Sequence, residues 1–357
     1  MSRQQTNLVT IGSVQLGAGN AIALQSMTNT DTRDVQATLE QVRQLASAGC
    51  DLVRISVPDL ESVTAFGKIV KESPCPLIAD VHFDYRLAIG ALKQGASKVR
   101  INPGNIGDWD KVEAIIAAAK ERQAAIRIGV NGGSLPRHIL AKYEKPTAQA
   151  LVEAGLEYLD RFLAADFNQM VFSFKSSDVL TTIQAYRLAA SKLDWPLHIG
   201  VTEAGTTWRG TIHSCVGIGT LLAEGIGDTI RVSLTADPVQ EAKVGLEILR
   251  SLSLRPTGIS VTSCPTCART PENLIALAEQ FEQMVAGMAG QARVAIMGCA
   301  VNGPGEAREA DLGLALGPGK ALLFVKGQIV ESVPIDHALE RLYEEVSRFV
   351  TTKDGLA

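Results

Sequence analysis

The sequence predicts an α/β protein in which a (β/α)₈ barrel of the TIM type is followed by a small mixed α/β domain. Short apolar runs alternate with amphipathic segments eight times in roughly the first 250 residues, which is typical of a parallel sheet covered by helices. Eight such units match the size of a closed barrel. The full length of 357 residues exceeds what one core usually serves. We therefore expect a barrel over residues 1–253 and a second domain over residues 254–357.

The eight apolar runs are expected to be the barrel strands. They are residues 21–28, 51–57, 76–82, 98–102, 125–131, 169–175, 196–203 and 228–234. Helices are expected between them, including residues 34–48, 60–71, 108–123, 178–193 and 238–252. Gly49 and Gly95 follow two helical segments, as glycines just past a helix end do. An open doubly wound sheet is the alternative, but the sequence contains neither its glycine fingerprint nor a Walker A motif.

The second domain begins after a linker at residues 254–258. Strands are expected at residues 259–262, 293–297, 312–316, 321–326 and 328–332, with helices at 271–288 and 336–350. Thr270 is expected to cap the first of these helices, with Pro271 as its first residue.

The composition favours a soluble globular protein. Apolar residues make up 46% of the chain and charged residues 20%, with a net charge of −4. We find no apolar run long enough for a membrane span, no long basic run for nucleic acid, and no signal-peptide pattern at the start. A cytoplasmic protein without membrane or nucleic-acid partners is expected.

Polar side chains stand at the carboxyl ends of nearly all predicted barrel strands, where a buried parallel strand should be apolar. They are Arg54, Ser56, Asp80, His82, Arg100, Asn102, Arg127, Asn131, Lys175, Glu203, Arg231 and Ser233. Within one strand these residues are an even number apart, so they share a face. We expect this face to line the barrel mouth, where such barrels carry their active sites. His198 lies earlier in its strand and fits the core equally well.

The predicted mouth has more cations than carboxylates. An ion pair would explain any one of them, but five buried cations without an anion would repel one another and lose hydration. Arginine forks match phosphate oxygens, so the sequence predicts a site for a diphosphate. Asp80, His82 and Glu203 are the candidates for hydrogen bonding or proton transfer, and Glu203 fits a structural role nearly as well.

Three of the six cysteines form a metal-binding pattern. Cys264 and Cys267 make a C-x₂-C motif, Cys299 follows later in a glycine-rich stretch, and Glu306 is the one obvious fourth ligand. Zinc is possible, but a structural zinc site usually has a fourth Cys or His nearby. An iron–sulfur cluster with one displaceable oxygen ligand fits better. Cys50, Cys75 and Cys215 stand alone and are expected to be small buried residues.

Four stretches resemble the 4-hydroxy-3-methylbut-2-enyl diphosphate synthases of the non-mevalonate isoprenoid route, in the short two-domain form. They are residues 25–30 (QSMTNT), 217–233, 263–267 (SCPTC) and 297–306 (MGCAVNGPGE). The resemblance covers nearly the whole chain. It implies a [4Fe–4S] cluster held by Cys264, Cys267, Cys299 and Glu306. It also implies two-electron ring opening and deoxygenation of 2-C-methyl-D-erythritol 2,4-cyclodiphosphate, with reduced flavodoxin or ferredoxin as electron donor.

The resemblance also assigns the polar residues of the mouth. The substrate diphosphate is expected among Arg54, Arg100, Asn102, Arg127, Asn131, Lys175, Arg231 and Ser233. Asp80, His82, Glu203 and Glu306 are expected at the reacting end, with Glu203 as the candidate proton donor.

The linker predicts a head-to-tail homodimer. Each barrel helix runs from the mouth to the opposite end, so the last one delivers the linker far from the active site. A few linker residues, at roughly 3.5 Å each, are too short to return over the mouth. A cluster domain is therefore expected to cap the barrel of a second copy.

Two other functions remain open from the residues alone. The barrel permits an aldolase or a pterin-binding enzyme that uses Lys175, because a fold does not determine a function. The cysteine motif permits an iron–sulfur electron carrier or iron sensor, although such a protein does not need a polar barrel mouth.

Overall fold

The computed structural model describes residues 3–102, 104–255, 258–267, 270, 273–299 and 310–354. The chain forms two compact units, Met1–Arg255 and Pro256–Ala357. Each unit has its own apolar core. The division falls two residues after the position that the sequence suggested.

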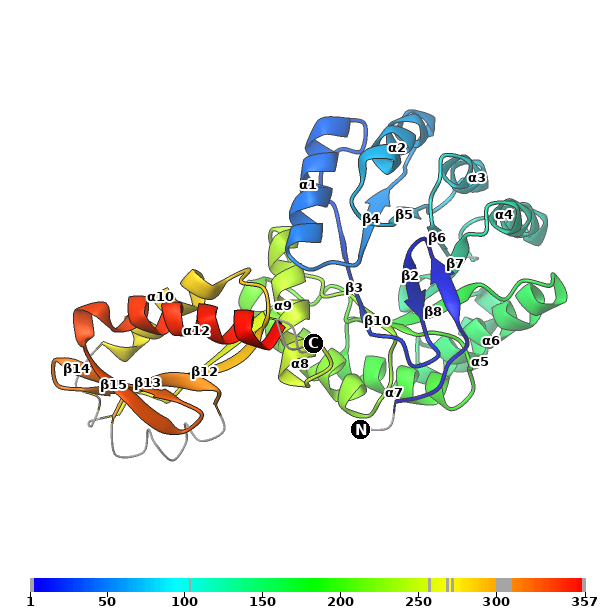
Figure 1. The fold of residues 1–357 in the computed structure, drawn as a ribbon. Coiled ribbons are helices and arrows are strands. Elements are labelled where there is room, and N and C mark those ends of the chain that lie inside the picture. Colours follow the sequence, from blue (N-terminus) through cyan, green and yellow to red (C-terminus); the bar gives the residue numbers. More distant parts are fainter. Residues whose placement is uncertain are drawn as a thin grey trace. The chain divides into compact units, whose positions relative to one another are not determined.

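The first unit is a parallel β/α barrel, which confirms the predicted fold class (Figure 1). Its strands are β3 (Ala23–Met27), β4 (Leu52–Ser56), β5 (Leu77–Asp80), β6 (Lys98–Ile101), β7 (Ala125–Asn131), β8 (Met170–Lys175), β9 (His198–Ile199) and β10 (Thr229–Ile230). The order is β8-β7-β6-β5-β4-β3-β10-β9, and a parallel bridge between Phe172 and Leu197 brings β8 beside β9.

In the part of this unit that the structure describes, eight helices surround these strands. They are α1 (Val35–Ser47), α2 (Leu60–Glu72), α3 (Tyr85–Lys93), α4 (Trp109–Glu121), α6 (Ala148–Ala164), α7 (Val179–Ala190), α8 (Thr207–Ala223) and α9 (Pro238–Ser251). A short helix, α5 (Arg137–Tyr143), precedes α6. Gly49 and Gly95 follow α1 and α3 with φ of 97° and 101°, as predicted, because glycine has no Cβ to oppose the left-handed conformation.

The last two barrel strands are shorter than the sequence predicted. β9 and β10 contain two residues each, whereas residues 196–203 and 228–234 were expected to be extended. Glu203 has φ of 53°, a left-handed conformation that a strand does not accommodate. Glu203 lies beyond the end of β9, and Arg231 and Ser233 lie beyond the end of β10, rather than on these strands.

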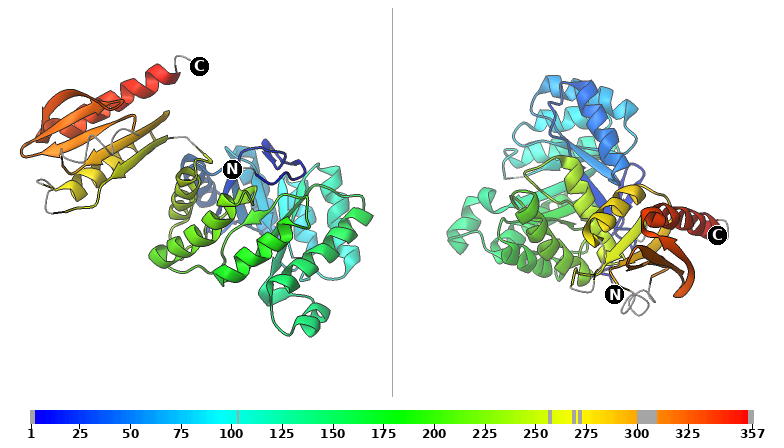
Figure 2. Two further views of the ribbon diagram at one scale, coloured as in Figure 1. Left: turned by 90° about the horizontal axis from the view of Figure 1, so that it is seen from below. Right: turned by 90° about the vertical axis from the view of Figure 1, so that its left-hand side faces the viewer.

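A hairpin absent from the sequence prediction closes the amino-terminal end of the barrel (Figure 2). β1 (Val9–Ile11) pairs antiparallel with β2 (Val14–Leu16). Apolar side chains of the hairpin pack on the first inward-facing residues of the strands, namely Ala23, Leu52, Ile78, Ala125 and Val171. This apolar floor leaves the opposite end, at the carboxyl ends of the strands, as the mouth.

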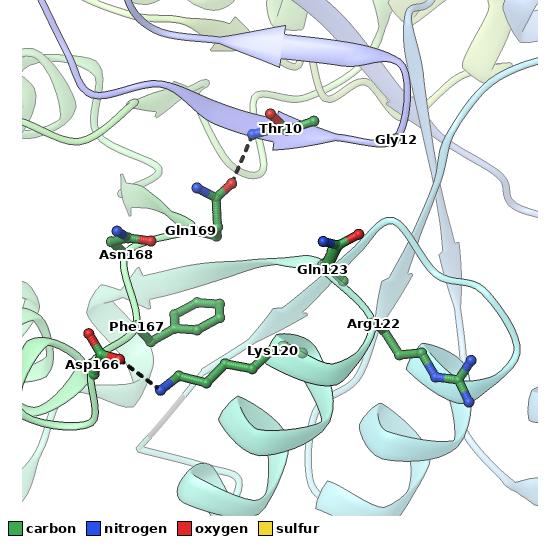
Figure 3. A pocket seen from close by; sticks show the side chains of 11 residues that line it. Thr10, Gly12, Lys120, Arg122, Gln123, Asp166, Phe167, Asn168 and Gln169 are labelled. Carbon is green, nitrogen blue, oxygen red and sulfur yellow. Dashed lines mark hydrogen bonds and ion pairs between the residues drawn. The ribbon is translucent and has the colours of Figure 1, made fainter.

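A pocket of about 630 Å³ lies beside the hairpin at this amino-terminal end (Figure 3). Its polar groups largely pair with one another. The Thr10 backbone N–H donates to Gln169 Oε1 at 3.0 Å, and Lys120 lies 3.5 Å from Asp166. Active sites of β/α barrels lie at the opposite end, at the carboxyl ends of the strands, so the pocket is not our candidate site.

Asp228 ties the first residues of the chain to the barrel. Its Oδ2 accepts from the Leu197 N–H at 3.0 Å, and its Oδ1 accepts from Thr6 Oγ1 at 3.0 Å and from Arg3 Nη2 at 3.3 Å. The Asp228 side chain is buried. One carboxylate thus satisfies three donors where β9, β10 and the amino-terminal segment meet.

The carboxyl-terminal end of the first unit is held at the amino-terminal face of the barrel. Arg255 forms a two-pronged ion pair with Asp51, at 2.7 and 2.8 Å. Asp51 directly precedes β4 and also accepts from the Leu24 N–H. The barrel chain therefore ends at the amino-terminal face, opposite the mouth.

The second unit is a five-stranded sheet with helices packed against it (Figure 1). The strands are β11 (Gly258–Ser263), β12 (Gln291–Met297), β13 (Leu312–Gly317), β14 (Lys320–Val325) and β15 (Gln328–Pro334), in that order. β11, β12 and β13 are parallel, and the last two pairings are antiparallel. Helices α10 (Leu274–Val285) and α12 (Ala338–Asp354) cover the apolar face.

Two details of the sequence prediction are wrong. Helix α10 begins at Leu274 and is capped by Asn273, whose side chain accepts from the Ala276 N–H, so Thr270 is not its cap. Cys50 is buried as expected, but Cys75 is half-buried and Cys215 on α8 is exposed.

Among the helices that the structure describes, none combines the length and apolar composition needed to cross a bilayer.

We predict that Asp228→Ala destabilises the barrel by about 2–4 kcal/mol, because it leaves buried donors unsatisfied. Urea unfolding followed by circular dichroism measures the change. Asp108→Ala is the matched control, since the exposed Asp108 side chain makes no capping hydrogen bond. An Asp228→Ala midpoint equal to that of the control would contradict the assigned role.

Candidate functional site

Charged side chains line the interior of the barrel on neighbouring strands. Ser56, Asp80, Arg100 and Arg127 are register partners in sequence across β4, β5, β6 and β7. Arg54, Asp80, Arg100, Arg127 and Lys175 are all buried. The structure therefore brings together the residues that the sequence placed on separate strands, because equal parity puts them on the same face of a closed sheet.

Asp80 is the carboxylate at the centre of this group. It lies 3.6 Å from Arg54 Nη1 and 3.3 Å from Arg100 Nη1. Burial alone would raise the pKa of Asp80, but Arg54, Arg100 and Arg127 outweigh burial and lower it to about 2. Asp80 is therefore ionised at neutral pH and offsets part of the surrounding positive charge.

The arginines keep unused donors. Burial lowers the pKa of Arg54 to about 10, and burial likewise lowers that of Arg127. Among the described residues, Arg127 Nε and Nη1 and the Nε atoms of Arg54 and Arg100 have no hydrogen-bond partner. Buried guanidinium donors without partners are unfavourable, so this group is suited to an anion with several oxygens.

His82 and Asn131 contact Arg100 from two sides. His82 Nε2 accepts from Arg100 Nη1 at 2.9 Å, and burial together with nearby arginines lowers the pKa of His82. His82 follows β5 rather than belonging to it, and it is exposed. With its amide oxygen turned toward Arg100, Asn131 accepts from Nη2 at 3.1 Å. Asn102, which is buried, accepts from the Gly104 N–H.

Lys175 belongs to a chain of polar groups across three strands. Lys175 Nζ lies 3.4 Å from His198 Nε2, and His198 Nδ1 lies 3.4 Å from Thr229 Oγ1. Burial, followed by the charge of Arg127, lowers the pKa of both Lys175 and His198 well below their usual ranges. His198 is thus a buried residue in contact with the site rather than a core residue apart from it.

Arg231 is oriented by a glutamate that the sequence analysis missed. Arg231 Nη2 lies 3.3 Å from Glu241 Oε2, which also accepts from Ser26 Oγ, and Glu241 Oε1 accepts from the Leu234 N–H. Glu241 is buried near the start of α9. Helical periodicity could have found it, as a charged residue on the apolar side of α9.

Two positions differ from the arrangement that the sequence suggested. Glu203 is exposed in the loop after β9, and no described hydrogen bond joins it to the arginine group. Lys98 is buried at the start of β6 and was overlooked, although it shares parity with Arg100 and Asn102. Ser233 lies half-buried two residues after Arg231.

In the second unit, adjacent parallel strands bring Cys264 and Cys299 to one end of the sheet. Ser263 pairs with Ile296, Cys264 follows Ser263 directly, and Cys299 is the second residue after the end of β12. The Gly298 N–H donates to Cys264 Sγ at 3.1 Å. A Cβ at Gly298 would lie 2.9 Å from Thr270 Oγ1, which accepts from the Cys267 N–H. Glycine is therefore needed where the two cysteine segments meet.

The metal ligands predicted from the sequence are only partly described. Cys264, Cys267 and Cys299 belong to the described residues, whereas Glu306 lies outside them. Among the described residues, no three His, Cys, Asp or Glu side chains are placed to hold one metal ion. The backbone N–H donated to Cys264 Sγ is nevertheless the hydrogen bond that iron–sulfur proteins supply to their sulfurs.

We predict that the stability contributed by Asp80 is lost in acid. A carboxyl pKa of about 2 in the folded state, against about 3.9 in the unfolded state, contributes about 2 kcal/mol above pH 4 that disappears as the pH falls to 2. Asp80→Asn should destabilise the barrel at pH 7 by about 3–5 kcal/mol, with a smaller effect near pH 3. Denaturant unfolding at several pH values measures this, with the exposed Asp166→Asn as control. A difference from wild type that is independent of pH would contradict it.

Family models match both units of the chain. Residues 6–246 match the GcpE TIM-barrel domain, and residues 260–348 match the GcpE protein C-terminal domain. The chain is 53% identical to a Clostridium perfringens protein, over 96% of this chain and 98% of that one. It is 52% identical to a Geobacter sulfurreducens protein, over 98% and 99%. Both relatives are named 4-hydroxy-3-methylbut-2-en-1-yl diphosphate synthase (flavodoxin).

Solved structures show the same barrel fold at low identity. Yersinia pestis dihydropteroate synthase matches with a TM-score of 0.51 and 13% identity, over 71% of this chain and 98% of that one. A Leptospira borgpetersenii N-acetylneuraminic acid synthetase matches with a TM-score of 0.52 and 12% identity, over 80% and 99%. These likenesses concern the fold alone, whereas the family models cover most of the sequence. The chain belongs to the GcpE family.

Proposed function

We propose that the protein reduces 2-C-methyl-D-erythritol 2,4-cyclodiphosphate to 4-hydroxy-3-methylbut-2-enyl diphosphate, with opening of the ring and loss of an oxygen atom as water. Two electrons drive the reaction. The observation that carries this proposal is the buried arginine group of the barrel, which has several unused donors and one central carboxylate. Membership of the GcpE family supports this reaction over the aldolase, pterin-binding and electron-carrier alternatives.

The barrel unit is proposed to hold the substrate. Arg54, Arg100, Arg127, Lys175 and Arg231 would bind the diphosphate, with Asn102, Asn131 and Ser233 as hydrogen-bonding neighbours. Asp80 and Glu241 orient Arg54, Arg100 and Arg231 before the ligand arrives, so little ordering remains to be done on binding. The same carboxylates limit the mutual repulsion of the guanidinium groups.

Proton transfer is proposed to involve His82 and Glu203. Arginine can only donate, so the neutral His82 ring accepts at Nε2 and carries its proton on Nδ1. This leaves Nδ1–H available to a substrate oxygen at the mouth. Glu203 is exposed in a neighbouring loop and would deliver a proton from solvent.

The second unit is proposed to hold a [4Fe–4S] cluster through Cys264, Cys267, Cys299 and Glu306. The donor set suits it, because thiolates are the preferred ligands of such clusters. The Gly298 N–H that meets Cys264 Sγ supports the same assignment. When bound, the cluster would supply the two electrons, one at a time. Glu306, as an oxygen ligand, would be the most readily displaced of the four.

Flavodoxin is the proposed electron donor, because the relatives are named as flavodoxin enzymes. Ferredoxin is the alternative donor. With either donor, the proposed location of the reaction is the cytoplasm.

A head-to-tail homodimer is proposed to bring the two halves of the active site together. The Arg255–Asp51 ion pair holds the end of the barrel chain at the face opposite the mouth, and β11 begins only three residues later. Exposed apolar side chains ring the mouth at the starts of α2, α7 and α8 and after β5, namely Leu60, Leu180, Trp208 and Phe83. Trp208 is 79% exposed and Phe83 is 75% exposed. Leu60 and Phe83 follow the neighbouring strands β4 and β5, and Leu180 and Trp208 follow β8 and β9, so exposed apolar side chains on two sides of the mouth support an interface there.

We predict that the full chain, prepared anaerobically with iron and sulfide, is coloured and forms the product with reduced flavodoxin. Cys299→Ser should remove the visible absorption and activity but keep substrate binding in the barrel. Arg127→Met should keep the absorption and weaken substrate binding roughly 10- to 100-fold, because charge-assisted hydrogen bonds are lost. Mass spectrometry of the product and calorimetry measure these effects. A colourless chain that binds the substrate would contradict the cluster assignment.

We predict that co-expression of Cys299→Ala and Arg127→Met chains restores about a quarter of wild-type activity, since half of randomly formed dimers would contain one intact composite site. Each variant alone should be nearly inactive. Tagging the two chains differently allows the mixed dimer to be purified and assayed. An inactive mixed dimer would contradict a shared active site.

A further inference from the structure

Lys98 is a fully buried lysine beneath the proposed diphosphate site. It is the first residue of β6, and its exposed fraction is 0%. Among the described residues, Lys98 Nζ has no hydrogen-bond partner. A lysine ammonium in this position would be strongly unfavourable unless another charge compensated for it.

The fold prevents Lys98 from reaching solvent. Lysine usually extends its stem along an apolar surface and keeps its ammonium in water. Here Lys98 is the register partner of Ile78 and Ala125, which belong to the apolar floor. The β1–β2 hairpin covers that floor with Val9 and Ile11. The barrel end below Lys98 is therefore closed to water by packed apolar side chains.

The charges around Lys98 are mainly positive. Burial lowers the pKa of Lys98 well below its usual range, and Arg127 and Arg54 lower it further. The pKa of the neighbouring His198 is likewise lowered, first by burial and then by the positive charges of Arg127, Lys175, Lys98 and Arg54. Among the described residues, the barrel interior also contains the ion pair of Arg100 with Asp80, and Arg231 pairs with Glu241. These surroundings favour the neutral amine while the mouth holds no anion.

We propose that Lys98 is a positioning residue for the diphosphate substrate, which gains a proton when the anion binds and then strengthens binding through Arg127 and Arg54. This inference rests on the proposed function. The proton comes from solvent through the mouth and adds to the lone pair of Nζ, so no covalent bond of the substrate changes. The bound diphosphate offsets the positive potential of the arginines and thereby makes the ammonium form favourable.

The sign of the coupling follows from linkage. Because the ligand raises the pKa of Lys98, protons are taken up between the ligand-free value and the ligand-bound value. Within that pH range, substrate binding strengthens as the pH falls. Full coupling of one group changes the dissociation constant about tenfold per pH unit.

The opposite view is that Lys98 only fills space beside the apolar floor. A purely structural lysine would destabilise the barrel when replaced and would leave proton uptake on binding unchanged. A lysine that serves ligand binding should give the opposite result. Removing its unpaired buried amine should stabilise the ligand-free protein. Replacing Lys98 should then raise the stability of the ligand-free protein and reduce the additional stability that the ligand provides.

The test uses the full chain loaded with its iron–sulfur cluster, under anaerobic conditions and without reductant. Lys98→Met keeps a similar volume, and Lys93→Met on the exposed end of α3 is the matched control. The probe is 2-C-methyl-D-erythritol 2,4-cyclodiphosphate. Calorimetry at pH 8 in two buffers with different ionisation enthalpies counts the protons taken up, and thermal unfolding gives the melting temperature with and without probe.

We expect Lys98→Met to raise the melting temperature without probe, to shrink the shift that the probe causes, and to weaken binding about tenfold. It should also take up fewer protons than wild type, by at most one per site. The Lys93→Met chain should behave as wild type. Lys98→Gln serves as the second variant if the methionine chain does not fold.

Two results separate this inference from the proposed function. A wild-type chain that does not bind the probe would contradict the diphosphate site itself. A wild-type chain that binds, with Lys98 variants of equal affinity and equal proton uptake, would overturn the role of Lys98 alone. Failure of both Lys98 variants to fold would also overturn it, because it would make Lys98 structural.

Discussion

The pairing of Asp80 with Arg54 and Arg100 is the interaction on which the rest of the barrel site depends. One carboxylate, with a pKa lowered to about 2, lies between two buried guanidinium groups and near a third. It offsets part of the surrounding positive charge, but among the described residues Arg127 Nε and Nη1 still have no hydrogen-bond partner. This partial compensation is what makes the mouth suited to an anion, since full pairing would leave no donors for a ligand.

The two ends of the barrel have different roles: contacts at the amino-terminal end stabilise the fold, and residues at the mouth are available for binding. At the amino-terminal end, the β1–β2 hairpin seals an apolar floor, and Asp228 and Asp51 fasten both ends of the barrel chain. At the mouth, several arginine donors have no hydrogen-bond partner within the described part of the chain, and apolar side chains such as Trp208 are exposed. Proteins commonly give up stability at their binding sites and recover it elsewhere. Lys98 lies between the apolar floor and the charged residues of the mouth.

The second unit depends on a close approach of the backbone. Two adjacent parallel strands carry Cys264 and Cys299 to one end of the sheet, and the absence of a Cβ at Gly298 allows Thr270 to approach. The N–H of Gly298 can then meet the Cys264 sulfur. In this way the glycine serves both the shape of the loop and the electrostatics around a thiolate.

The sequence by itself determined the order of the eight barrel strands, the shared face of the polar residues on β4 to β8, and the cysteine pattern, because these follow from local periodicity and spacing. It predicted the seven-residue strand β7 at residues 125–131 without error. It could not reveal the hairpin floor, the Glu241–Arg231 pair or the isolation of Lys98, since each depends on contacts between segments far apart in the chain. It also misplaced Glu203, whose left-handed backbone ends the extended chain. Only the closed barrel decided which charges compensate one another, because the pKa of a buried group is determined by all its neighbours in space rather than by its neighbours in sequence.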